Sequence, residues 1–257
     1  SHMTSKKTQP PARIRALTLN LVLSAIMLGI VLTVVLLAWY PDPYFRIQNT
    51  IRLVMVLAVV QLVLGPLLTF ILYKPGKKGL WFDIVVITLL QFAALAFGAN
   101  VLHEGKPRFM VYAVDRFNIL AAKDVDFSQI RDPRFLAQPE KGPLMVIANM
   151  PMDPEEFQRL LRETVFEGKP DLDRQPRYWG DYATGFPHIA AQAHTLADLR
   201  EARPDANRAI ERVLSATGRK AEELIFLGVI GKKEDYAVVL DPDSGEVLDA
   251  IACDPWF

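Results

Sequence analysis

Three long stretches without a charged residue decide what kind of protein this chain can be. They cover residues 16–40, 53–73 and 84–102. A helix of about 20 apolar residues crosses the core of a bilayer, so each stretch is long enough for one transmembrane helix. The sequence therefore predicts three membrane spans, at 16–40, 53–73 and 81–102, and Asp83 lies near the start of the third.

The two parts of the chain carry opposite net charges. The first 102 residues contain nine Lys or Arg and two Asp or Glu, a net charge of +7, and the remaining residues contain 20 and 27, a net charge of −7. The basic excess thus lies in the apolar part, which argues against a nucleic-acid-binding protein. Residues 1–3, Ser-His-Met, are typical of the remnant of a cloned affinity tag, and we infer no chemistry from them.

Basic residues beside the spans predict the orientation of the chain. They form two clusters, one before the first span and one between the second and third: Lys6, Lys7, Arg13 and Arg15, and Lys74, Lys77 and Lys78. An even number of crossings separates the clusters, so both lie on one side, which the positive-inside rule makes cytoplasmic. Residues 1–15 are then a basic cytoplasmic N-terminus, 16–102 the transmembrane domain, and 103–257 an exported domain, which is periplasmic in a bacterium with two membranes.

Small and polar residues inside the spans are candidate helix contacts. Small residues recur every four positions in the first and third spans: Ala25, Gly29 and Thr33, and Ala94 and Gly98. This spacing lets two helix backbones approach closely. Gln61 and Gln91 add hydrogen-bonding groups that are costly against lipid, and Gly65-Pro66 predicts a kink. The positions serve either packing among these three helices or binding of a helix from another protein, and the sequence leaves both open.

Asp83 is a candidate functional residue because a carboxylate inside a membrane is expensive. It would then belong to a small-molecule or proton site. The same residue stands in the first turn of a predicted helix, where it complements the helix dipole and where Lys77 or Lys78 can reach it. Both interpretations stay open.

The exported part, residues 103–257, is long enough for one domain with its own core. Strands are predicted at 109–114, 144–148, 224–230, 236–240 and 247–252, and helices at 154–168, 188–200 and 205–216, with a polar loop at 169–187. Helices in the middle and strands at both ends predict an α+β domain that ends in a three-stranded meander.

This domain shows no catalytic or metal-binding motif. Asp241 and Asp243 resemble the start of a calcium loop but lack the glycine and glutamate that an EF-hand requires at its sixth and twelfth positions. His188 and His194 are six residues apart and do not share one helical face. Cys253, the only cysteine, is predicted to be buried or to form an intermolecular disulfide. We therefore expect no catalytic residues, no metal and no cofactor, and a protein that is not an enzyme.

Several segments form a recognisable set: Trp39-Tyr-Pro-Asp-Pro-Tyr-Phe45, Leu64-Gly-Pro-Leu-Leu-Thr69, Lys74-Pro-Gly-Lys-Lys-Gly-Leu80 with Phe82-Asp83, and Val114-Asp-Arg-Phe117. These segments resemble the type IV pilin accessory protein family, TfpX/TfpZ. The resemblance is closest from Trp39 to Phe117. The same order of three spans and an exported tail extends it over nearly the whole chain.

The resemblance implies a chaperone-like protein of the bacterial inner membrane that binds and stabilises pilin before or during pilus assembly. Its implied partners are type IV pilin, the major pilin above all, membrane lipid and other membrane proteins of pilus assembly. Candidate pilin-binding residues are Ala25, Gly29, Thr33, Gln61, Pro66, Asp83, Gln91, Ala94 and Gly98, and Lys74, Lys77 and Lys78 are candidates for contact with lipid or pilin. The alternatives are a membrane enzyme or signal transducer with a site near Asp83, and a structural scaffold of the pilus machinery.

Overall fold

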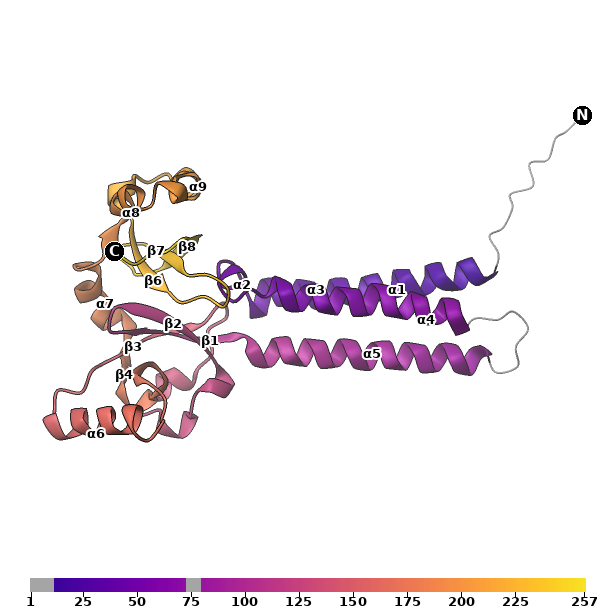
Figure 1. Ribbon diagram of the computed structural model, residues 1–257, viewed down its shortest axis with the longest axis horizontal. Helices are drawn as coiled ribbons and strands as arrows, with labels where there is room; N and C mark the ends of the chain where they lie inside the picture. The colour runs from indigo at the N-terminus through magenta and orange to yellow at the C-terminus, as the bar shows by residue number, and fades with distance from the viewer. Residues whose placement is uncertain (1–11, 73–79) are drawn as a thin grey trace, which may run out of the picture. The chain divides into compact units, whose positions relative to one another are not determined.

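The computed structural model describes residues 12–72 and 80–257. These residues form two compact units (Figure 1). The helical unit contains the described residues up to Val35 together with Ile51–His103, and the C-terminal domain contains Leu36–Thr50 together with Glu104–Phe257. Residues 36–50, which the sequence predicts as part of the transmembrane domain 16–102, thus belong to the fold of the C-terminal domain.

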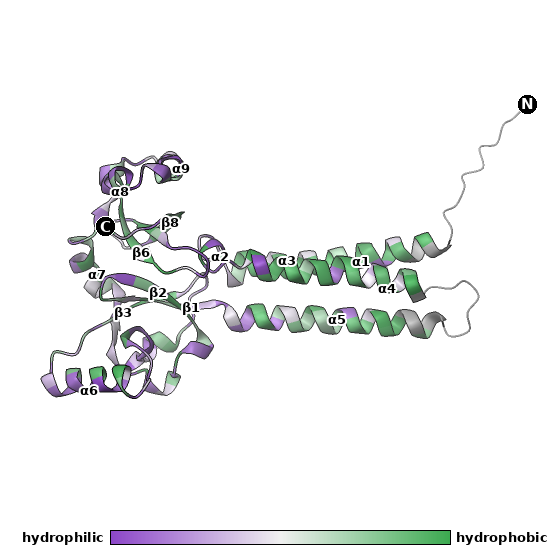
Figure 2. Ribbon diagram, viewed as in Figure 1, coloured by the Kyte–Doolittle hydropathy of each residue, from purple (hydrophilic) through white to green (hydrophobic). Residues whose placement is uncertain are grey.

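The described residues contain three long apolar helices, as the sequence predicts (Figure 2), and all but the last residues of the first and third belong to the helical unit. The first is α1 (Ala12–Val34), which continues into the π-helical turn η1 (Val35–Trp39). The second consists of α3 (Ile51–Val59), the π-helical turn η2 (Val60–Leu64) and α4 (Gly65–Leu72). The third is α5 (Leu80–Gly105). Leu17–Trp39, Ile51–Ile71 and Val85–Gly105 are long and apolar enough to cross a membrane. Large apolar side chains such as Leu19 and Phe97 face outward from them, as lipid would require.

A proline interrupts the second helix, and a wider turn accommodates it. Pro66 has no N–H to donate to the carbonyl of Leu62, one turn earlier. The π-helical turn η2 ends at Leu64, directly before Gly65. A π-helical turn, a common cause of bending in long helices, thus directly precedes Gly65-Pro66, where the sequence predicts a kink.

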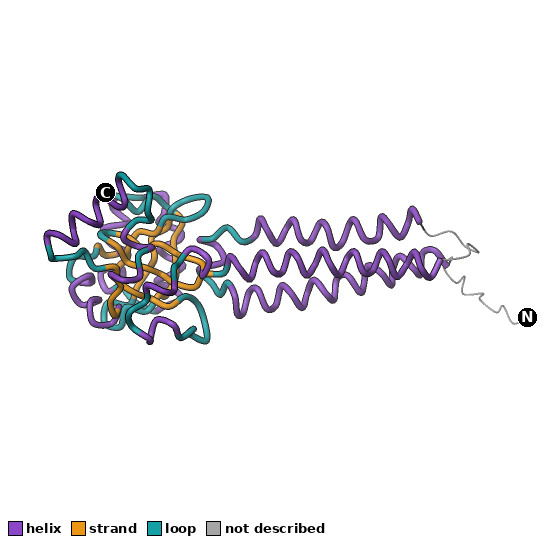
Figure 3. The backbone as a smooth tube through the Cα atoms, turned by 90° about the horizontal axis from the view of Figure 1, so that it is seen from below, coloured by secondary structure: helices purple, strands orange, loops and turns teal. Residues whose placement is uncertain are grey.

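One mixed sheet forms the centre of the C-terminal domain (Figure 3). Its strands are β1 (Pro107–Ala113), β2 (Arg116–Ala121), β3 (Leu144–Ala148), β4 (Trp179–Asp181), β5 (His194–Thr195), β6 (Ile225–Val229), β7 (Tyr236–Leu240) and β8 (Val247–Ala252). They lie in the order β4-β3-β1-β2-β6-β7-β8, with β5 also paired to β6. The pairs β1–β3 and β2–β6 are parallel, and the other pairs are antiparallel. The last three strands pair in chain order but continue the same sheet as β1 to β4.

Helices cover both faces of this sheet. They are α2 (Tyr44–Ile47), α6 (Pro154–Val165), α7 (Tyr182–Ala190), α8 (Leu196–Ala202) and α9 (Asn207–Thr217). Their ends carry the expected signals: the Asp153 carboxylate accepts the N–H of Glu156 at the start of α6. Gly218 ends α9 in the left-handed conformation, with φ of 67°.

Side chains that alternate along the strands divide the core into clusters. On one face, α2 and α7 pack on Ile225, Leu227 and Val229 of β6 and on their neighbours in the sheet. On the other face, Phe226 of the same strand belongs to a cluster beneath α8 and α9, while Phe109 belongs to a separate cluster over β1, β3 and β4. This period of two is what a strand buried on both faces produces.

Some predicted elements differ from the observed ones. The helix predicted over 188–200 is wrong, because α7 ends at Ala190 and the short strand β5 precedes α8. The predicted loop 169–187 contains β4 and the start of α7. Strand β2 has no predicted counterpart. These strands are short, and their pairing partners decide their conformation.

Candidate functional site

Three of the predicted pilin-binding residues lie on an exposed face of α1. Ala25, Gly29 and Thr33 are all exposed, and we call them the α1 stripe. A Cβ built on Gly29 would have no described atom within 4 Å outside its own helix and neighbours. The Thr33 hydroxyl donates to the Gly29 carbonyl at 2.8 Å, so its polar group is satisfied within the helix. The α1 stripe therefore offers a close approach to a helix from another molecule.

Gln91, in contrast, lies inside the helical unit. Its side-chain oxygen accepts a hydrogen bond from Asn20 at 2.9 Å, and its nitrogen donates to the Ser24 hydroxyl at 3.0 Å. A Cβ built on Gly65 would lie 1.6 Å from the same nitrogen, so the glycine leaves the space that the amide fills. Gln91 thus joins α5 to α1 beside α4, which is the internal packing that the sequence left open as one of two roles.

Four more candidates in the second and third helices also lie within the unit or are partly buried in it. Gln61 is buried, and its side-chain oxygen has no hydrogen-bond partner among the described residues. Gly98 faces α3, where an added Cβ would lie 2.5 Å from a methyl carbon of Leu57. Ala94 and Pro66 are partly buried. These residues are therefore poorly placed to receive a partner helix without rearrangement.

The charged candidates lie wholly or partly outside the described residues. Lys74, Lys77 and Lys78 lie outside the described residues. Asp83 belongs to α5, but its side chain also lies outside the described part. Of the predicted set, the structure places Gln91 beside Gly65 and Ser24 and leaves the α1 stripe exposed.

Two partners of Gln91, Asn20 and Ser24, were not singled out from the sequence. They are four residues apart in the first span, so they share one face of α1. Two polar side chains at this spacing inside an apolar helix are a sequence signal for a helix–helix contact. Because hydrogen bonds among membrane helices need matched partners, the pairing with Gln91 required the tertiary structure.

The segment between the first two long helices is anchored in the C-terminal domain. Ile47 is fully buried and Tyr44 nearly so, and both belong to the core under β6 and β7. Burial raises the pKa of Tyr44 to about 12. The backbone N–H of Lys232 donates to the Ile47 carbonyl at 3.1 Å, and the Tyr236 hydroxyl donates to the Arg46 carbonyl at 3.3 Å. We call Pro41–Thr50 the anchor segment.

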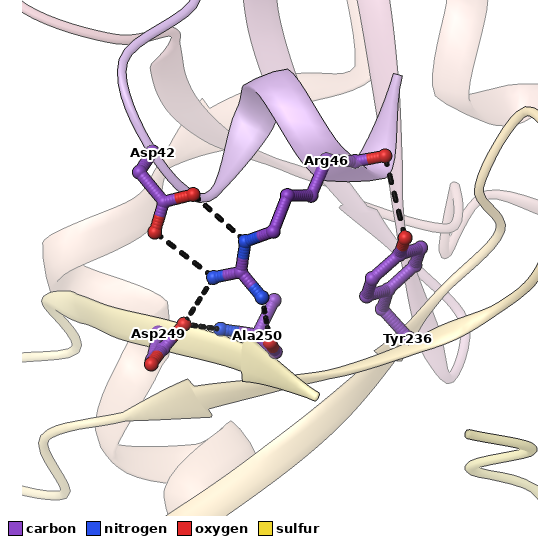
Figure 4. A network of polar contacts seen from close by, with 5 residues as sticks. All are labelled: Asp42, Arg46, Tyr236, Asp249 and Ala250. Carbon is purple, nitrogen blue, oxygen red and sulfur yellow. Dashed lines mark hydrogen bonds and ion pairs between the residues drawn. The ribbon is translucent and has the colours of Figure 1, made fainter. Parts of the chain in front are cut away.

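Arg46 is the polar centre of the anchor segment (Figure 4). Its guanidinium donates to both carboxylate oxygens of Asp42, at 2.8 and 2.9 Å, and to the carboxylate of Asp249. It also donates to the Ala250 carbonyl at 2.8 Å. The bonds to Asp42 and Asp249 raise the pKa of Arg46, against the opposing effect of burial. Arg46 thus joins the anchor segment to β8 through charge-assisted hydrogen bonds.

These contacts also occupy part of a sheet edge. β8 is the last strand in the order, so among the described residues no strand pairs with its outer side. At Ala250 the carbonyl accepts from Arg46, and the N–H donates to the Asp249 carboxylate at 2.7 Å. Charged side chains at an edge strand hinder pairing with another chain. The anchor segment therefore makes a hydrogen bond to a backbone carbonyl at the sheet edge and also contributes buried side chains to the core.

We expect Arg46→Ala to destabilise the C-terminal domain by about 1–2 kcal/mol, since charge-assisted bonds are lost but the side chain is partly exposed. Thermal unfolding of the detergent-solubilised protein measures the change. Arg134→Ala is the control, because Arg134 is 69% exposed and its shortest ion pair is with the nearby Asp132. A melting temperature that falls equally in both variants would contradict the role of Arg46.

The acidic turn and the cysteine considered in the sequence analysis both lie in the C-terminal domain. Within residues 12–72 and 80–257, no three His, Cys, Asp or Glu side chains are grouped to hold a metal ion. Asp241 instead accepts the backbone N–H groups of Asp243 and Ser244, as a turn residue does. Cys253 is a free, partly buried thiol, and burial raises its pKa to about 11. A thiol with so high a pKa is a poor nucleophile.

Comparisons with known proteins identify relatives from one bacterium, Dichelobacter nodosus. The fimbrial assembly protein of serogroup I is 26% identical over 229 residues, which are 87% of each chain. The fimbrial assembly protein of serogroup E1 is 26% identical over 209 residues, 79% of this chain and 80% of the relative. That of serogroups C1 and C2 is 31% identical over 109 residues, 42% of this chain and 80% of the relative.

No family model and no solved structure matches the chain. The similarity to the serogroup I protein extends over most of both sequences, and the serogroups C1 and C2 protein is matched over most of its own length. The chain belongs to the family of the fimbrial assembly proteins.

Proposed function

We propose that this protein assists type IV pilus assembly by binding pilin in the inner membrane and stabilising it before or during its entry into the fibre. The observation that carries the proposal is the similarity, over 87% of both chains, to a fimbrial assembly protein. The resemblance of Trp39 to Phe117 to the TfpX/TfpZ accessory proteins supports the same role. No turnover is expected of such a protein.

The architecture suits a client that has a membrane helix and a globular head. A pilin waiting in the membrane exposes one long apolar helix, and the α1 stripe is an exposed close-packing surface for such a helix. The C-terminal domain supplies a second surface for the exported head. Two linked contacts raise the effective concentration of each, so weak individual contacts suffice for a stable complex.

The proposed topology places the N-terminus in the cytoplasm and the C-terminal domain in the periplasm. It is supported by the two basic clusters beside the spans and by three helices that are apolar and long enough to cross a membrane. In this topology Lys74, Lys77 and Lys78 face the cytoplasm, where anionic lipid attracts them.

Co-purification with pilin tests the proposal. The tagged protein is extracted in mild detergent from a pilus-producing strain, and captured pilin is measured for the unchanged chain, for Gly29→Leu and for Ala96→Leu. We expect Gly29→Leu to reduce capture at least tenfold, because a bulky side chain fills the α1 stripe. Ala96→Leu should capture normally, since Ala96 is an exposed small residue of α5 outside the stripe.

The outcomes separate the proposal from its alternatives. Pilin capture that Gly29→Leu leaves unchanged would move the contact away from the α1 stripe. Absence of pilin with the unchanged chain, together with other pilus membrane proteins in the eluate, would favour a scaffold. Gly98→Leu is unsuitable as a probe of binding, because it collides with Leu57 inside the unit.

A further inference from the structure

Arg108, near the start of β1, is a buried cation without a partner of opposite charge in the described part of the chain. Only 6% of the residue is exposed. Its Nη2 donates to the Leu136 and Ala137 carbonyls at 2.8 and 3.1 Å. Its Nη1 is buried and has no hydrogen-bond partner among the described residues. Burial lowers the pKa of Arg108, and no described carboxylate offsets this effect. The guanidinium is therefore only partly satisfied within the domain.

Such a buried arginine calls for an anion, because arginine stays protonated in proteins. Charged groups inside proteins are normally paired, since removal of a charge from water is costly. Arg46 of the same domain has a side chain that is 40% exposed and is nevertheless paired with the carboxylates of Asp42 and Asp249. Arg108 is more deeply buried and contacts only carbonyl groups, which carry partial charges. We therefore expect its counter-ion to come from outside the described chain.

Lys106 adds a second positive charge beside Arg108. Burial, and after it the charge of Arg108, lower the pKa of Lys106, so the two cations lie close together. Lys106 is only partly buried, in contrast to Arg108. From Glu104 to Arg108 the chain contains one acidic and two basic residues, a net charge of +1. An anion bound at Lys106 would also reduce the repulsion between the two cations.

The position of these cations in the chain indicates which anion is within reach. The helix Val85–Gly105 has 21 residues and is long and apolar enough to cross a membrane. At 1.5 Å per residue its length is about 31 Å, close to the thickness of the hydrocarbon core of a bilayer. Lys106 follows this helix directly, and Arg108 lies at most about 10 Å beyond its end. Phospholipid headgroups begin at this depth, and a long basic side chain can reach their phosphates.

We propose that Lys106 and Arg108 bind the phosphate group of an anionic phospholipid in the leaflet where α5 ends. Lys106 makes the direct contact, and Arg108 supplies the unneutralised positive charge beneath it. This site lies at the opposite end of the third span from Lys74, Lys77 and Lys78, the candidates for lipid contact that the sequence predicts. It does not depend on pilin, so it extends the proposed function without resting on it.

Thermal unfolding with added lipid tests the proposal. The full-length protein in an uncharged detergent is heated with phosphatidylglycerol, with the zwitterionic phosphatidylethanolamine, or with inorganic phosphate. Phosphatidylglycerol should raise the unfolding temperature by about 3 °C or more, because a ligand that binds the folded state stabilises it. The other two additions should raise it by less than half as much.

Two variants locate the site. Lys106→Gln removes the partly exposed charge, and Arg108→Gln removes the buried one; each should lose at least half of the shift, measured against its own unfolding temperature without lipid. Lys106→Gln decides the test if Arg108→Gln fails to fold. Lys220→Gln is the control, since Lys220 is an exposed lysine before β6 and should keep the full shift.

The results separate the possible sources of the anion. A shift with phosphatidylglycerol that Lys106→Gln loses and Lys220→Gln keeps supports the proposal. An equal shift with phosphatidylethanolamine overturns it, because lipid of any charge would then suffice. An equal shift with inorganic phosphate overturns the assignment to lipid. No shift in the unchanged protein, or a full shift in Lys106→Gln, also overturns the proposal and leaves the proposed function unaffected.

Discussion

Ile47→Asp is expected to unfold the C-terminal domain. Ile47 is fully buried in the core under β6 and β7, although the chain reaches it before the second long helix. A carboxylate there would be buried without a partner, and we expect a loss of about 4 kcal/mol or more. Ile47→Val removes one methylene and should cost about 1 kcal/mol. Limited proteolysis and thermal unfolding of the solubilised full-length protein measure both changes.

The matched control is Ile230→Asp, the same substitution at a residue that is 48% exposed. It should leave the unfolding temperature nearly unchanged. If Ile47→Asp resisted proteolysis as well as Ile230→Asp does, the anchor segment would not belong to the core. For the same reason, a fragment that begins at Glu104 lacks Tyr44 and Ile47, and a separate C-terminal domain must be supplied with the anchor segment.

Gly65→Leu is expected to disrupt the helical unit. The position beside Gly65 is filled by the Gln91 side chain, which is bonded to Asn20 and Ser24. A leucine would displace this amide and leave polar groups unpaired among apolar helices. Overpacking and the lost hydrogen bonds together should cost about 3 kcal/mol. The unfolding temperature in detergent and the yield of inserted protein measure the effect.

Gly29→Leu is the control, because the same substitution meets open space on the exposed face of α1. It should leave the yield and the unfolding temperature unchanged. Equal yields and unfolding temperatures for Gly65→Leu and Gly29→Leu would show that the position of the Gln91 side chain beside Gly65 does not contribute to the stability of the helical unit. Together the two variants separate internal packing from a surface that is open to a partner.

The sequence alone predicted the division into three long apolar helices and an α+β domain. It could do so because about 20 uncharged apolar residues have few alternatives to a membrane helix, and because alternation and caps are local signals. The strand at 144–148 and the helix that starts at Pro154 were predicted for this reason. The helix predicted across His194 failed, because pairing of β5 with β6 overrides a weak local preference.

The candidate site was predicted only in part. A small or polar residue in a span serves either packing among the protein's own helices or binding of a partner helix, and the sequence pattern is the same for both. The structure exposes Gly29 and encloses Gly98 against Leu57, although both occur at the same four-residue spacing. Likewise, in the sequence Arg46 is only one of the charged residues between the first two spans. Its bonds to Asp249 and Ala250 join residues about 200 positions apart.

The apolar helices, the charge asymmetry and most of the strands could thus be predicted from the sequence, since each follows from neighbouring residues. The tertiary structure was needed to show that the anchor segment belongs to the C-terminal domain and that Gln91 packs internally. The physical reason is that burial is a property of contacts between distant segments. The neighbouring residues in the chain do not determine which face of a helix or strand another segment will cover.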